Sequence, residues 1–136
     1  MTIVVDASIA SAWLFAEQRA ADLIAIARSV AAGGASAPAL FVLEVRNVIL
    51  MYERRKRIDR AMADRLLDRI GRVGILIDER GAGERISAVV EIARHHSLTV
   101  YDATYLELAR RLGARLASLD AQLRAAAAAE GIQVLP

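Results

Sequence analysis

Three short apolar runs in this sequence each end on an aspartate that is followed by alanine. The three aspartates are Asp6, Asp102 and Asp120, and a helical pattern begins directly after each of them. Open α/β sheets with parallel strands bind their ligands in the crevice at the carboxyl ends of the strands. If the three runs are parallel strands of one sheet, the three carboxylates lie at the same edge. The pattern therefore favours an α/β sheet and makes that edge the candidate functional site.

Strand and helix patterns alternate along the 136 residues, a length typical of one domain. Short apolar runs predict buried strands at residues 3–5, 75–77, 99–101 and 116–118, and an edge strand at 132–135. Helical spacing predicts helices after Asp6 and at residues 19–32, 39–57, 60–72, 83–96, 102–112 and 120–130. We therefore predict one domain, residues 1–136, with a three-layer α/β/α architecture and a mainly parallel central sheet.

The helices at 39–57 and 60–72 are expected to form an αα-hairpin that projects from the sheet. Pro38 is expected just before or inside the start of the first helix, because it cannot take a central ladder position. Asp59 is the expected N-cap of the second helix. Inward-facing positions are expected at Met62, Leu66, Leu67 and Ile70 and, in the next helix, at Ile86, Val89, Val90, Ile92 and Ala93. The Arg54–Arg57 run at the end of the hairpin suits RNA phosphates or a solvated face, and the sequence leaves both open.

Composition excludes several classes of protein. Cysteine is absent, which removes disulfides and thiolate metal sites. The longest uncharged stretch, residues 29–43, is shorter than the ~20 apolar residues of a membrane-spanning helix and contains two glycines and a proline. We expect a cytoplasmic protein with no membrane association. The hydrophobic fraction of 56% is high for a small domain, which favours a protein partner or self-association.

A fourth carboxylate, Glu44, lies inside the most apolar helical pattern, three residues before Asn47 and on the same face. Each aspartate taken alone is interpreted more simply as a helix N-cap. A carboxylate on an apolar helix face, however, costs several kcal/mol unless it is paired or binds a metal. Four clustered carboxylates stay ionised only with a cation among them, and oxygen ligands fit Mg²⁺ or Mn²⁺. Such ions support phosphodiester hydrolysis.

Four segments together resemble PIN-domain nucleases, and among them the VapC-type toxins of toxin–antitoxin pairs. The resemblance spans residues 3–123, and the segments that carry it are Val4-Val5-Asp6-Ala7-Ser8 with Trp13, Leu43-Glu44-Val45-Arg46-Asn47, Thr99-Val100-Tyr101-Asp102-Ala103-Thr104-Tyr105-Leu106-Glu107-Leu108-Ala109, and Ser118-Leu119-Asp120.

The resemblance implies a metal-dependent endoribonuclease that cuts structured cellular RNA such as tRNA. Its catalytic and metal-binding residues would be Asp6, Glu44, Asp102 and Asp120, with Mg²⁺ or Mn²⁺ as cofactor. Residues that support them or position water would be Ser8, Asn47 and Ser118, the last replacing a more usual threonine. The resemblance also implies a homodimer and a cognate antitoxin. A non-catalytic PIN-fold module that binds RNA or a protein partner is the alternative.

Overall fold

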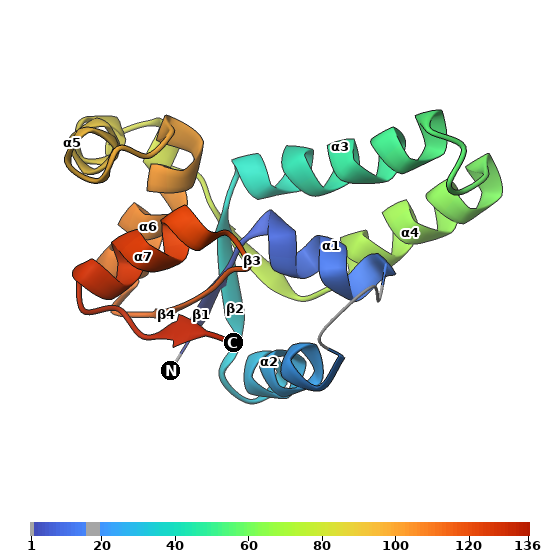
Figure 1. Cartoon of the computed structure of the whole chain (residues 1–136), viewed down its shortest axis with the longest axis horizontal. Helices are drawn as coiled ribbons and strands as arrows, with labels where there is room; N and C mark the ends of the chain where they lie inside the picture. Colours follow the sequence, from blue (N-terminus) through green and yellow to red (C-terminus); the bar gives the residue numbers. More distant parts are fainter. Residues whose placement is uncertain (1, 16–19) are drawn as a thin grey trace.

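A computed structural model describes residues 2–15 and 20–136 of the chain, and its centre is a parallel sheet in the order β3-β2-β1-β4-β5 (Figure 1). The strands are β1 (Ile3–Val5), β2 (Ala35–Pro38), β3 (Ile75–Asp78), β4 (Arg115–Ala117) and β5 (Val134–Leu135). All four pairings between neighbouring strands are parallel. The predicted parallel α/β architecture is confirmed.

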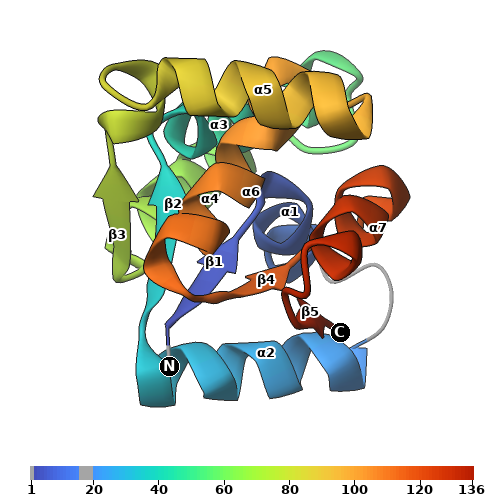
Figure 2. The ribbon, with the colours of Figure 1, turned by 90° about the vertical axis from the view of Figure 1, so that its left-hand side faces the viewer.

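Helices cover both faces of this sheet. They are α1 (Ala7–Phe15), α2 (Ala20–Gly33), α3 (Leu40–Arg54), α4 (Arg60–Arg72), the 3₁₀ turn η1 (Arg80–Ala82), α5 (Ile86–His96), α6 (Val100–Leu112) and α7 (Ala121–Ala129). Figure 2 shows the five strands side by side with α6 in front of them, and α6 contacts β1, β2 and β4. Val4 of β1 belongs to the core under α6, whereas Ile3 and Val5 pack with α1 and α2. The central strand is therefore buried on both faces, as a parallel sheet requires.

The αα-hairpin formed by α3 and α4 is confirmed and extends away from the strands, to the right in Figure 1. Asp59 caps α4 as predicted, because its side chain accepts a hydrogen bond from the backbone N–H of Met62 at 2.7 Å. Leu66 and Ile70 are buried, while Met62 is 38% exposed and does not face the core. In α3, Val45 and Ile49 face the core.

The predicted strand at residues 99–101 is wrong. Thr99 is instead the N-cap of α6, and its hydroxyl accepts a hydrogen bond from the backbone N–H of Asp102 at 3.0 Å. The β-branched pair Thr99-Val100 is typical of a strand, but the threonine oxygen satisfies a free helix donor here. Asp102 therefore lies in the first turn of a helix and does not follow a strand.

The sequence interpretation missed β2, although its placement of Pro38 just before a helix is confirmed, since α3 begins at Leu40. β2 lies between β1 and β3, and Pro38 is its last residue, opposite Asp78. The ladder to β1 has already ended at Ser36, and the next backbone N–H, that of Ala39, bonds to Asp78 of β3. The missing N–H of Pro38 therefore falls on the side where no strand pairing remains.

The strand predicted at residues 75–77 exists, but it lies at the sheet edge and is not buried. Leu76 of this strand is 74% exposed. The helix predicted from residue 83 begins at Ile86, which is 42% exposed, and only Val89, Ile92 and Ala93 of the predicted inward set are buried. The predicted start of the second helix at Arg19 lies outside the described residues. Within residues 2–15 and 20–136, no helix has the length and apolar character needed to cross a membrane.

Candidate active site

Asp6 follows β1 directly and is only 5% exposed. Its Oδ1 accepts hydrogen bonds from the backbone N–H groups of Ser8 at 3.0 Å and Ile9 at 3.2 Å. The Ser8 hydroxyl also donates to Oδ1, and the Ser118 hydroxyl donates to Oδ2. Burial raises the pKa of Asp6, and the hydrogen bonds from the two serines and the backbone partly oppose this rise. Asp6 is therefore a buried carboxylate in a fixed orientation.

The two serine hydroxyls join the end of β1 to the end of β4. Each hydroxyl donates a hydrogen bond to Asp6 and also accepts one from the backbone. Ser8 Oγ accepts from the N–H of Leu119 at 2.9 Å, and Ser118 Oγ accepts from the N–H of Asp120 at 3.0 Å. Both protons are thus committed to the same carboxylate. The serines support Asp6 and are not arranged as nucleophiles.

Asp102 and Asp120 lie at the N-termini of two helices. Asp102 is half-buried in the first turn of α6, and Asp120 is the N-cap of α7, accepting from the backbone N–H of Leu123 at 2.8 Å. Helix N-termini stabilise negative charge. Burial nevertheless raises the pKa of Asp102, as does repulsion from Asp120 and Asp6. This repulsion shows that the three aspartates share one electrostatic environment.

Glu44 reaches the same environment from α3. Its Oε1 accepts a hydrogen bond from the hydroxyl of Tyr105 at 2.7 Å. Burial raises the pKa of Glu44, and repulsion from Asp102 and Asp6 raises it further, although the Tyr105 bond opposes the rise. The four predicted carboxylates therefore come from four separate parts of the chain, and Asp102 is repelled by each of the other three.

Tyr105 packs in the core, and the sequence analysis did not predict that it also contacts Glu44. The side chain is 1% exposed, as core packing requires, but its hydroxyl lies against Glu44. Burial and the Glu44 charge raise the pKa of Tyr105, which keeps the hydroxyl protonated as a donor. The available signal was its position three residues after Asp102, on the same side of α6.

Asn47, the remaining predicted residue, lies one turn after Glu44 and is exposed. Both residues line a shallow cavity of about 210 Å³ together with Ser8 and Ser11. The amide of Asn47 contacts Met51 Sδ at 3.7 Å, and within residues 2–15 and 20–136 it makes no hydrogen bond to a carboxylate. Its place at the cavity suits contact with a bound molecule or water.

The donor set of this site fits a divalent cation chemically. Among residues 2–15 and 20–136, no three His, Cys, Asp or Glu side chains are arranged to hold one ion together. Mg²⁺, however, usually keeps several waters and binds one or two carboxylates directly. Burial raises the pKa values of Asp6, Glu44 and Asp102, and repulsion between carboxylates adds to the rise for Glu44 and Asp102. A bound cation would oppose both effects by stabilising the ionised forms.

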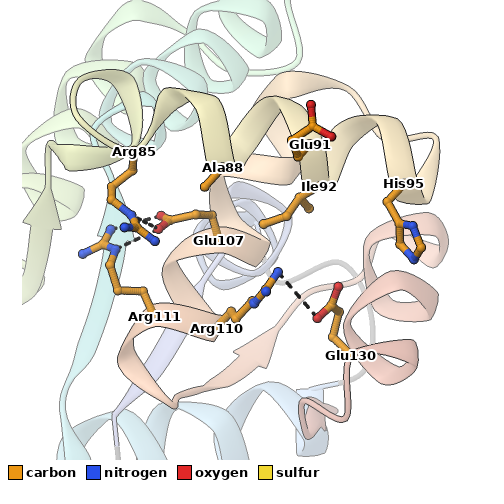
Figure 3. Close-up of a pocket in the computed structure, with 9 residues that line it drawn as sticks. All are labelled: Arg85, Ala88, Glu91, Ile92, His95, Glu107, Arg110, Arg111 and Glu130. Atoms are coloured by element: carbon orange, nitrogen blue, oxygen red, sulfur yellow. Dashed lines mark hydrogen bonds and ion pairs between the residues drawn. The ribbon is translucent and has the colours of Figure 1, made fainter.

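A second cavity of about 590 Å³ lies between α5, α6 and the end of α7 (Figure 3). Most of its ionic side chains pair with one another, and Glu91 pairs with Arg94 outside the cavity. Arg85 and Arg111 both bind Glu107, and Arg110 Nη1 lies 3.9 Å from Glu130. Since its positive and negative side chains balance, this cavity has no surplus charge for a phosphate or a cation. The acidic edge of the sheet remains the candidate site.

Comparison with known proteins gives consistent matches. The family model described as the PIN domain matches residues 3–129. Ribonuclease VapC3 of Pyrobaculum aerophilum is 30% identical over 124 residues, which cover 90% of this chain and 92% of that protein. The crystal structure of PAE2754 from the same organism has a TM-score of 0.72 at 24% identity and covers 93% of this chain and 84% of that one.

A third similar protein is VapC20 of Mycobacterium tuberculosis, described as a Sarcin-Ricin loop cleaving toxin. Its structure has a TM-score of 0.65 at 18% identity, with coverage of 98% of this chain and 99% of that one. At this level of identity, the likeness shows a shared fold.

Proposed function

This chain belongs to the PIN-domain family, and from that premise we propose that it is a metal-dependent endoribonuclease, the toxin of a toxin–antitoxin pair. The observation that supports this most is the repulsion among carboxylates at one edge of the sheet. Asp102 is repelled by Asp6 and Asp120, and Glu44 is repelled by Asp6 and Asp102. Such a cluster costs stability unless a cation neutralises it, so function is the simplest reason for its presence.

The residues divide into distinct roles in this proposal. Asp6 and Asp102 hold a Mg²⁺ or Mn²⁺ ion, and Asp120 completes the site. The ion supplies Lewis-acid stabilisation of the charge that develops on the phosphate during hydrolysis. Glu44 holds the ion as well or orients the attacking water. Because Oε1 is bonded to Tyr105, the proposal assigns that task to Oε2. The raised pKa of Glu44 makes it a better proton acceptor than an ordinary carboxylate.

Ser8 and Ser118 fix Asp6, so that the carboxylate does not need to reorganise during the reaction. Asn47 lines the entrance and contacts the substrate or positions water.

The substrate we propose is structured RNA such as tRNA. The relative at 30% identity is named a ribonuclease, and the structurally similar VapC20 is described as cleaving the Sarcin-Ricin loop. The partners are a cognate antitoxin and a second copy of this chain in the cytoplasm. Exposed apolar side chains such as Leu43, Leu76 and Tyr101, which are 72%, 74% and 66% exposed, support the existence of covering partners.

The test is cleavage of end-labelled total tRNA by purified protein in Mg²⁺, in Mn²⁺ and in chelator. Asp102→Asn serves as the matched control, because it removes one charge and preserves side-chain shape. Discrete cuts that need the metal and disappear in the variant support the proposal. If folded protein free of antitoxin makes no cuts in tRNA or in broader RNA pools, the proposal is refuted in favour of a non-catalytic binding module.

A further inference from the structure

The turn that joins α3 to α4 carries four consecutive basic residues, Arg54, Arg55, Lys56 and Arg57, here called the basic tip. All four are exposed. None of the ion pairs in the described part of the chain includes them, although most other arginines near α5 and α6 are paired with acids. The basic tip lies at the end of the hairpin farthest from the strands (Figure 1). Its charge is therefore available to a partner.

The conformation of the basic tip is fixed by local contacts. Lys56 adopts a left-handed conformation with φ of 57°, and its backbone N–H bonds to the carbonyl of Glu53 at 2.9 Å. The Arg57 guanidinium lies 5.4 Å from the centre of the Tyr52 ring, which stacks on Phe15 with ring centroids 3.9 Å apart. A cation over an aromatic ring is held in place. The backbone of the tip and the Arg57 side chain therefore lose little conformational entropy when the tip binds a ligand.

The helix that carries the basic tip also carries Glu44 of the acidic site. Arg55, the C-cap of α3, is eleven residues after Glu44, which is three helical turns plus about 20°. It therefore lies at the end of the side of α3 that carries Glu44. The same spacing separates them by roughly 16 Å along the helix axis. Asn47 and Met51 lie between them on this side. One side of a single helix thus connects the acidic site to the cationic cluster.

We propose that the basic tip binds the phosphate backbone of the RNA substrate at a distance from the cleaved bond, so that the RNA lies along α3. This inference rests on the proposed ribonuclease function. Three of the four residues are arginines, whose planar guanidinium groups bind phosphate oxygens through two hydrogen bonds. Contacts to phosphates position a nucleic acid without reading its sequence. The basic tip would then set affinity and register, and the acidic site would perform the hydrolysis.

The experiment compares two triple variants with the same loss of charge. In the tip variant Arg54→Gln, Arg55→Gln and Lys56→Gln are combined, and Arg57 is retained because it packs on Tyr52. The control combines Arg28→Gln, Arg72→Gln and Arg94→Gln, three exposed arginines on α2, α4 and α5. Binding of fluorescein-labelled total tRNA is measured by anisotropy in an Asp102→Asn background over a range of salt concentrations. Cleavage is measured without that background change.

We expect the tip variant to bind RNA more weakly and its log–log salt slope to fall by about 2, since each phosphate contact to a single strand contributes about 0.7. Its KM should rise while kcat at saturating RNA stays unchanged, and the control should match the parent protein. The single variant Arg55→Gln should show about one third of the change in slope.

Equal slopes for the tip variant and its control would overturn the inference and leave the tip as a solvated face or a surface for an acidic protein. That result would not affect the ribonuclease proposal as long as the parent protein cleaves RNA. Absence of both binding and cleavage in the parent protein would refute the ribonuclease proposal, and the inference with it.

Discussion

Glu107 on α6 offers a sharp test of how the helix that carries Asp102 and Tyr105 is held. The side chain is 2% exposed, and its Oε1 accepts from Arg85 Nε at 3.0 Å and from Arg111 Nε at 2.9 Å. Arg111 also donates a hydrogen bond to Asp78 at the end of β3, with 2.7 Å between Nη2 and Oδ2. Figure 3 shows the two arginines converging on Glu107. This network ties α6 to β3 and to the start of α5.

Removal of one partner from a buried ion pair typically costs about 3–5 kcal/mol. The Glu107→Ala variant should fall at the lower end, about 3 kcal/mol, because Arg85 is 44% exposed and Arg111 keeps Asp78. For a chain of this length, about 3 kcal/mol corresponds to a decrease in Tm of roughly 10 °C. The measurement is thermal unfolding followed by circular dichroism in chelator, where no metal contributes.

The matched control is Glu91→Ala, because the Glu91–Arg94 pair is more than 70% exposed on both sides. Such surface pairs contribute only about 0–1 kcal/mol. A Tm of the Glu107→Ala variant within about 2 °C of the control would contradict the assignment of a stabilising role to the network.

Three further predictions concern the acidic site. In chelator at pH 7–8, Asp102→Asn should unfold at a higher temperature than the parent protein. The pKa of Asp102 is raised in the folded state, so its contribution to stability is present below its ordinary pKa and is lost as pH rises through the raised value. A stability difference between the two proteins that is no larger at pH 7–8 than near pH 4 would contradict this. Tyr105→Phe should lower kcat about 10–100-fold with little change in KM, because a hydrogen bond to a charged group contributes about 1.5–3 kcal/mol, and unchanged kcat would exclude a role in orienting Glu44. Ser118→Ala should lower both cleavage rate and stability, the latter by about 1–3 kcal/mol, whereas Ser118→Thr should preserve both; equal loss in the two variants would show that the hydroxyl donated to Asp6 is not the cause.

The sequence predicted the parallel α/β architecture because β1, β3 and β4 carry apolar residues and because Asp59 and Asp120 mark helix starts. β2 was not predictable in the same way. Its residues are Ala35, Ser36, Ala37 and Pro38, none of them β-branched, and its place in the sheet depends on pairing with β1 and β3. Thr99-Val100 shows the opposite case, where β-branched residues begin a helix because a hydroxyl caps it. Tertiary pairing and a local cap overrode intrinsic propensity in these two places.

The candidate site was partly accessible to sequence reasoning for a similar reason. Aspartates after β1 and β4 follow from the topology of a parallel sheet. Asp102 comes from the start of α6. The sequence analysis expected it to follow a strand, and that part of the expectation was wrong. The contact between Tyr105 and Glu44 joins residues 61 positions apart, and no local pattern encodes it. The catalytic roles of these residues stay predictions.

The most direct test of the central claim is Mn²⁺ binding to the protein without RNA, measured by isothermal titration calorimetry. The claim is that Asp6, Glu44, Asp102 and Asp120 hold a divalent cation. We predict saturable binding to the parent protein, weaker binding as pH falls and the raised-pKa carboxyls take up protons, and no measurable binding to a variant that combines Asp6→Asn with Asp102→Asn. Equal Mn²⁺ affinity in the parent protein and the folded double variant would contradict the claim.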